Sequence, residues 1–123
     1  METSDVVAAL AALAQDNRLE IFRLLVQAGP DGLAAGRVAE ELDLAPNTLT
    51  FHFDRLRVAG LVTVRRDGRS MIYAARYETM NGLLAFLTAN CCQGVAAACA
   101  PVECKPAKSA KSTKPTRKKE RVS

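Results

Sequence analysis

Size and charge limit what this chain can be. It has 123 residues, 49% of them hydrophobic, and a net charge of +4, which suits one small domain with a modest core. No apolar run approaches the roughly 18 residues that a membrane span requires, and the acidic start, METSDVVAAL, does not resemble a signal peptide. We therefore expect a cytoplasmic protein without a membrane partner, whose thiols stay reduced.

The charge is divided unevenly along the chain. Residues 105–123 hold six lysines, two arginines and one glutamate, a charge of +7, so the preceding 104 residues carry −3. This tail is rich in Lys, Pro, Ser and Thr and has too few apolar residues to form a core, so we expect it to be disordered. It either keeps the protein in solution or attracts phosphates without specificity.

Apolar residues at helical spacing predict three helices in the first part of the chain. The first covers residues 4–14, the second starts with Asp16 as N-cap and stops at Gly29-Pro30, and the third covers residues 34–44. The side chains expected to face the core are Val6, Leu10, Leu13, Leu19, Ile21, Phe22, Leu24, Leu25, Val38, Ala39 and Leu42.

A fourth helix is expected from Pro46, a favoured first helical residue, to Gly60, which ends it. Its inward row is Leu49, Phe53 and Leu56. The other faces carry Asn47, Thr48, Thr50, Phe51, Asp54 and Arg55. An exposed Phe among small polar residues at a helix start is unusual for a surface that only contacts water.

The pattern then changes to strands. Residues 61–64 and 70–74 are strand-like, and Asp67-Gly68 between them is a strong hairpin turn signal. Three arginines crowd the tip of this hairpin: Arg65, Arg66 and Arg69. A last helix is expected over about residues 78–91, with Leu83, Leu84, Phe86 and Leu87 as its apolar residues. The predicted fold is mainly α with a β-hairpin, in the order ααααββα.

Two short helices joined by a tight connection and followed by a cationic hairpin indicate a winged helix-turn-helix. Small polar side chains near the start of the second helix can reach base edges in the major groove of double-stranded DNA. The hairpin arginines can hold phosphates or enter the adjacent minor groove. The DNA-binding residues predicted from this pattern are Asn47, Thr48, Thr50, Phe51, Arg55, Arg65, Arg66 and Arg69, and the family resemblance described next adds His52. Alternatively, the polar residues of the helix are only caps and surface side chains.

Three segments resemble the ArsR/SmtB family of winged-helix repressors: DNRLEIFRLL, TFHFDRLRVAGLV and RRDGRSMIY. The resemblance covers about residues 4–92. It implies a homodimer formed through the first and last helices, which reads a palindromic operator with one recognition helix per half-site. His52 falls in a Ser/Thr-x-His segment of the family, and the resemblance gives it a structural or phosphate-contacting role; a lone imidazole cannot build a metal site.

All four cysteines lie near the end of the chain, at Cys91, Cys92, Cys99 and Cys104. The family's known Cys-x-Cys arsenic site has no counterpart in residues 39–46, and the zinc-type site on the last helix lacks its histidines. Thiolates select soft ions, and trivalent arsenic or antimony favours three sulfurs. We expect Cys91, Cys92 and Cys99 to bind As(III) or Sb(III) as inducer, with Cys104 as the reserve third ligand. NCCQG also resembles a subgroup of arsenic-responsive members with a vicinal pair, and the pair alone suits a methylated arsenical.

Other interpretations of the thiols remain open. Neighbouring thiols oxidise readily, which makes a redox-sensing repressor the stronger rival. A Cys₄ zinc site and simple burial of the thiols are less consistent with the spacing. A cytosolic arsenic-binding carrier is the alternative outside gene regulation. Because the sequence has no paired carboxylates, Ser/His/Asp set or phosphate-binding glycine loop, we expect neither an enzyme nor an organic cofactor.

The sequence therefore predicts three regions: a DNA-binding and dimerisation domain over residues 1–92, a cysteine-containing arm over residues 93–104, and the basic tail over residues 105–123. The function expected is repression of an arsenic-resistance operon, relieved when the inducer binds the thiolates.

Overall fold

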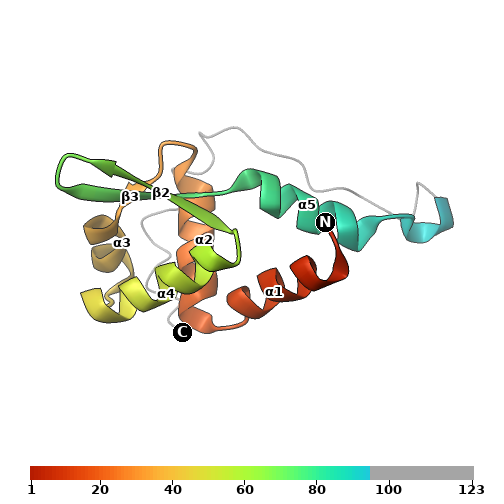
Figure 1. Cartoon of the computed structure of the whole chain (residues 1–123), viewed down its shortest axis with the longest axis horizontal. Coiled ribbons are helices and arrows are strands. Elements are labelled where there is room, and N and C mark those ends of the chain that lie inside the picture. Colours follow the sequence, from red (N-terminus) through yellow and green to blue (C-terminus); the bar gives the residue numbers. More distant parts are fainter. Residues whose placement is uncertain (95–123) are drawn as a thin grey trace. The chain divides into compact units, whose positions relative to one another are not determined.

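Five α-helices and a three-stranded antiparallel sheet make up the computed structural model of the chain, which describes residues 1–94 (Figure 1). In chain order the elements are α1 (Thr3–Leu13), α2 (Asp16–Ala28), β1 (Leu33–Ala34), α3 (Ala35–Leu42), α4 (Pro46–Val58), β2 (Val62–Asp67), β3 (Ser70–Ala75) and α5 (Tyr77–Thr88), followed by a 3₁₀ turn, Cys91–Gly94. The chain divides into one unit over Met1–Ala89 and a second that begins at Asn90. No helix within residues 1–94 is long and apolar enough to cross a membrane. Cys99, Cys104 and the basic tail lie outside the described residues.

The mainly helical fold with a β-hairpin wing is confirmed, with one strand added to the predicted order. β1 pairs with β3, which also pairs with β2, so the sheet order is β1-β3-β2. Leu33 lies opposite Tyr73, and the chain enters this pairing through Gly32 with φ of 76°. A Cβ atom at Gly32 would collide with the carbonyl oxygen of Tyr73, so only glycine allows the two backbones to approach this closely.

The helix ends follow local chemistry. α4 begins at Pro46 as predicted, and Gly60, with φ of 80°, lies just beyond its end. α2 is capped one residue earlier than predicted, because the side chain of Gln15 rather than Asp16 accepts a hydrogen bond of 3.0 Å from the Arg18 backbone N–H. The predicted turn at Asp67-Gly68 closes the hairpin, where Asp67 pairs with Ser70.

The core is formed where α2, α3 and α4 pack together and against the sheet. Its largest fully buried side chains are Phe53, Ile21, Leu25, Leu56, Leu61 and Val38. The predicted inward row of α4 is buried in full. Two predicted core residues are exposed instead: Leu10 (42%) and Leu19 (44%). In α1 the buried face consists of Val6, Ala9 and Ala12, because small side chains let this helix lie close to its neighbours.

The last helix is shorter than predicted. α5 ends at Thr88, whose hydroxyl donates to the carbonyl oxygen of Leu84 at 2.8 Å, and Asn90 then has φ of 59°. Asn tolerates this left-handed conformation better than most residues, so it suits a helix end. Cys91 therefore does not lie on α5. It begins the separate 3₁₀ turn, in the second unit of the chain.

Candidate nucleic-acid interface

The face of α4 opposite the core carries the predicted DNA-reading residues. Asn47, Thr48, Thr50, Phe51 and Arg55 are all exposed, while Leu49, Phe53 and Leu56 on the other face are buried. The hydroxyl of Thr50 donates to the carbonyl oxygen of Pro46 at 3.0 Å, which leaves its oxygen able to accept a further hydrogen bond. The helix thus presents amide and hydroxyl groups in its first turns, where helix-turn-helix proteins contact bases.

Phe51 is the unusual residue on this surface. Its side chain is 51% exposed, and the Arg55 guanidinium carbon lies 5.0 Å from the ring centroid, a cation–π contact within one helical turn. The ring also meets His52 edge-on, with 5.7 Å between centroids. The pair combines an apolar surface, which suits a thymine methyl, with a cation that suits a phosphate or guanine.

His52 differs from the other predicted contacts because it is buried, with 6% exposure. Its Nδ1 lies 3.4 Å from Nη1 of Arg18 at the start of α2. Burial, with the nearby charge of Arg18 as a second cause, lowers the pKa of His52, so the imidazole is uncharged near neutral pH. This placement suits the structural role implied by the family resemblance better than direct contact with phosphate.

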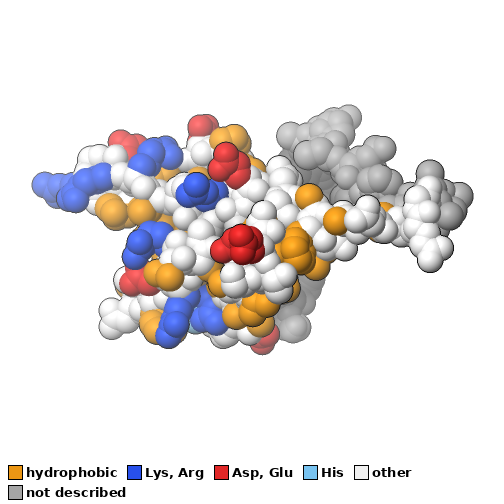
Figure 2. Space-filling model, turned by 45° about the vertical axis from the view of Figure 1, so that its right-hand side comes forward, with side chains coloured by type: hydrophobic (Ala, Val, Ile, Leu, Met, Phe, Trp, Pro, Cys, Tyr) orange, Lys and Arg blue, Asp and Glu red, His pale blue; other side chains and the backbone are white. Residues whose placement is uncertain are grey.

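Arginine side chains gather at the tip of the β2–β3 hairpin, at the left of Figure 2. Arg65, Arg66 and Arg69 are exposed, and Nε of Arg66 donates to the Gly68 carbonyl oxygen at 3.4 Å. A hairpin with three exposed guanidinium groups is well suited to contact the DNA backbone beside the groove that the helix reads.

The wing and α4 are joined by an aromatic stack. The rings of Phe53 and Tyr73, on β3, lie 3.6 Å apart between centroids and are nearly parallel, at 2°. Burial raises the pKa of Tyr73, with the charge of Asp54 as a second cause, so the phenol remains neutral. Because both rings belong to the packed interior, the stack fixes the two candidate DNA-contacting elements relative to each other.

The predicted inducer ligands are only partly within the described residues. Cys91 and Cys92 are both half-buried and adjacent in the 3₁₀ turn, where Cys92 has φ of 56°. Within residues 1–94 no cluster of three His, Cys, Asp or Glu side chains could hold a metal ion. A three-sulfur site therefore requires Cys99, Cys104 or a thiol of another subunit.

Comparison with known proteins identifies the family. Residues 13–65 match the family model described as a helix-turn-helix domain. The uncharacterized HTH-type transcriptional regulator YceK of Bacillus subtilis is 36% identical over 73 residues, covering 59% of this chain and 72% of YceK. An ArsR-like transcriptional regulator from Rhodococcus sp. RHA1 has the same fold with a TM-score of 0.61 and 26% identity, over 68% of this chain and 76% of that one. The chain is a helix-turn-helix transcriptional regulator of the ArsR family.

The solved structure of HlyU from Vibrio cholerae is also similar to this regulator. It is 30% identical, with a TM-score of 0.57, over 71% of this chain and 97% of that one. The region that matches the helix-turn-helix model contains α2, α3, α4 and the start of the wing, which include the elements of the candidate DNA interface.

Sequence patterns did not reveal that Arg18 lies beside this candidate surface. Arg18 lies next to α4 although 34 residues separate it from His52, and its Nε donates to the Ala12 carbonyl oxygen at 2.6 Å. Nothing in the local pattern of α2 distinguishes it from an ordinary surface arginine, because the contact depends on how three helices meet.

Proposed function

We propose that this regulator is a homodimeric repressor of an arsenic-resistance operon, released from its operator when trivalent arsenic or antimony binds its C-terminal thiolates. The observation that carries the DNA-binding part is the set of exposed amide, hydroxyl and aromatic side chains on α4 beside an arginine-tipped wing. One recognition helix per subunit would read one half-site of a palindromic operator.

Exposed apolar side chains on two neighbouring helices support the dimer. α1 and α5 pack against each other (Figure 1). The exposed apolar residues of the two helices include Val7 (57%) and Leu10 (42%) on α1, and Leu84 (53%) and Leu87 (57%) on α5. Large apolar side chains left exposed on two neighbouring helices are typical of an interface, and a second copy of the chain would bury them isologously.

The dimer has a direct test in sedimentation equilibrium. Leu84→Lys and Leu87→Lys should shift the protein to monomer, because each places a charge in the interface core. Leu19→Lys is the matched control, since Leu19 is an exposed leucine (44%) on α2, outside this surface. A dimer that survives all three substitutions would exclude α5 from the interface.

The arsenic assignment is supported by the chemistry of the donors. Two adjacent half-buried thiols supply soft ligands, which prefer soft ions to Mg²⁺ or Ca²⁺, and Cys99 or Cys104 would supply the third sulfur. A solved structure of similar fold, with 26% identity and a TM-score of 0.57, is described as a possible transcriptional regulator for arsenical resistance. Each As–S bond formed from As(OH)₃ displaces one hydroxide, which leaves as water with the thiol proton, so ligation below the thiol pKa releases no net protons.

Thermodynamic linkage relates the loss of operator affinity to the difference in inducer affinity between the two states of the dimer. Each tenfold loss of operator affinity corresponds to about 1.4 kcal/mol of difference in inducer affinity between the two dimer states. In our proposal, binding ties the cysteine arm to the end of α5 and favours a dimer whose two recognition helices no longer match the half-site spacing.

A thiol-redox repressor is the second candidate. Two adjacent thiols can be oxidised reversibly, and a solved form of the HlyU neighbour is described as reduced HlyU. Zinc regulation within the same fold, and an arsenic carrier without operator binding, are the further alternatives that the test below distinguishes.

The test is fluorescence anisotropy of an operator duplex titrated with arsenite in reducing buffer. Wild type is compared with Cys91→Ser, Cys92→Ser, Cys99→Ser and Cys104→Ser. The proposal is supported if arsenite releases the wild-type protein from the duplex while some of the serine variants stay bound. The variants that stay bound then identify the cysteines that ligate the inducer. Release by peroxide or zinc but not by arsenite would contradict the arsenic assignment, and arsenite binding without operator binding would favour the carrier.

A further inference from the structure

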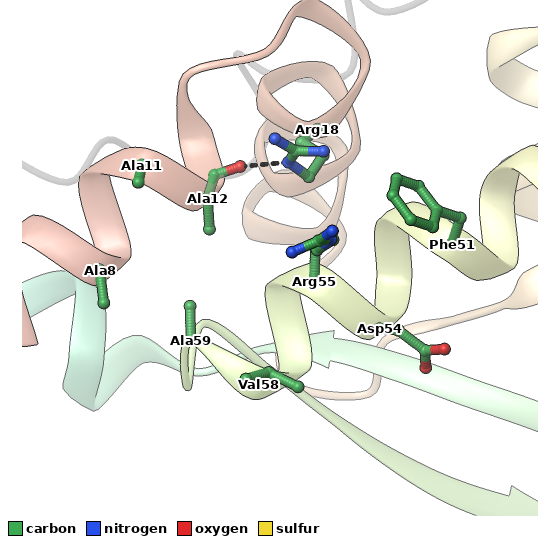
Figure 3. A pocket seen from close by; sticks show the side chains of 9 residues that line it. All are labelled: Ala8, Ala11, Ala12, Arg18, Phe51, Asp54, Arg55, Val58 and Ala59. Carbon is green, nitrogen blue, oxygen red and sulfur yellow. Dashed lines mark hydrogen bonds between the residues drawn. The ribbon is translucent and has the colours of Figure 1, made fainter.

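A cavity of about 500 Å³ opens beside the recognition helix, where α1, the start of α2 and α4 meet (Figure 3). Its walls are mostly small or apolar: Ala8, Ala11, Ala12, Val58 and Ala59. Two arginines, Arg18 from α2 and Arg55 from α4, also line it. The second of these belongs to the predicted DNA-reading surface, so the cavity lies at the edge of that surface.

Arg18 is held in position before any ligand arrives. Its Nε donates to the Ala12 carbonyl oxygen at the end of α1, and its Nη1 lies 3.4 Å from the imidazole Nδ1 of His52. Arginine normally loses considerable side-chain freedom when it is ordered. Because the protein already fixes this guanidinium, its remaining N–H groups can bind an anion at little additional entropic cost.

No carboxylate in the part of the chain that the structure describes forms an ion pair with either cavity arginine. The ion pairs within residues 1–94 involve Arg37, Arg57 and Arg76, but neither Arg18 nor Arg55. Asp54 also lines the cavity, yet its carboxylate is 3.7 Å from Arg57 and points away from both cavity arginines in Figure 3. The neighbouring His52 is uncharged near neutral pH because its pKa is lowered. The cavity therefore combines two positively charged side chains with walls of small, apolar side chains.

We infer that Arg18 and Arg55 form a binding site for a backbone phosphate of the operator, flanking the recognition helix on the side opposite the wing. A phosphate offers oxygens that match a guanidinium fork, and the alanine walls leave room for the adjoining deoxyribose. The inference rests on the proposed operator binding and adds Arg18, which the wing and α4 do not include. With the arginines of the wing, it places phosphate contacts on both flanks of α4, which fixes the register of the helix in the groove.

The experiment uses the full-length protein and an operator duplex selected from random DNA, in which single phosphates are replaced in turn by uncharged methylphosphonates. Wild type should lose about tenfold in affinity at one linkage in each half-site, as expected when a charge-assisted hydrogen bond is removed. Arg18→Gln should bind the unmodified duplex about tenfold more weakly and should lose most of the sensitivity at that same linkage, because only Arg55 remains to contact the phosphate. Its slope of log K against log salt should fall by about 0.9 for each half-site.

Matched variants separate phosphate binding from a purely structural effect. Arg23→Gln changes an exposed arginine of α2 that does not line the cavity, and it should keep the wild-type sensitivity at every linkage. Arg18→Lys retains the charge and should keep most of the salt slope. If Arg18→Gln instead weakens binding equally for all duplexes, or no linkage loses its effect in that variant, Arg18 only supports the fold and the inference is wrong. Wild-type protein that binds no duplex would refute the proposed function itself, whereas a purely structural role of Arg18 leaves operator binding intact.

Discussion

Replacing Phe53 by alanine tests how the recognition helix is joined to the wing. The side chain is 1% exposed and stacks on Tyr73 of β3, with 3.6 Å between ring centroids. Phe51, two residues earlier in the same helix, is 51% exposed and contacts Arg55 instead. The two phenylalanines thus form an internal comparison in which residue type and helix are the same and only the environment differs.

The expected magnitudes differ several-fold. Truncating a buried Phe to Ala costs about 3–5 kcal/mol, a large part of the roughly 5–15 kcal/mol by which a small domain is stable. For a domain of this size the melting temperature should fall by about 15–30 °C. Phe51→Ala removes a cation–π interaction of about 0.5–1 kcal/mol but adds about 0.5 kcal/mol of helix propensity, so its stability should change little while operator affinity falls.

Urea unfolding followed by circular dichroism measures both variants, with Phe53→Leu included in case Phe53→Ala does not fold. The stack and burial of Phe53 would be refuted if Phe53→Ala cost less than about 1.5 kcal/mol, or if Phe51→Ala cost as much as Phe53→Ala. Anisotropy on operator DNA then checks that Phe51→Ala weakens binding although the protein remains folded.

Three further outcomes are expected. Gly32→Ala should destabilise the protein by more than about 2 kcal/mol in urea unfolding, because the new Cβ meets the β3 backbone and φ is positive. Gly36 lies on α3, where an added Cβ would meet open space, so Gly36→Ala should stabilise the protein by about 0.5–1 kcal/mol. The pKa of His52 is lowered below 6.5, so the unfolded state binds more protons than the folded state. The free energy of unfolding should therefore fall as pH drops below 6.5, with a slope of at most about 1.4 kcal/mol per pH unit. His52→Gln should remove this slope between about pH 7 and 5.5. Arg66→Gln and Arg69→Gln should each lower the salt slope of operator binding by about 0.9 for every phosphate that the wild-type side chain neutralises, and unchanged slopes would remove the wing from the interface.

Elements with strong local signals could be predicted from the sequence. Pro46 and Gly60 bound the recognition helix, and Asp67-Gly68 closes the wing, because each of these residues restricts or permits particular backbone angles regardless of its surroundings. The spacing of Leu49, Phe53 and Leu56 likewise predicted which face of α4 is buried, since helical geometry alone places them in one row.

Features that depend on distant partners became visible only in the folded chain. Two residues, Leu33 and Ala34, have no strand periodicity and become β1 only because Gly32 lets them reach β3. Leu10 and Leu19 have core-like spacing but are exposed, because helices are amphipathic over wide stripes and the neighbours determine which edge is covered. Arg18 lies beside α4 because α1, α2 and α4 converge on its guanidinium. Such contacts arise from the packing of whole helices, which no short segment of sequence specifies.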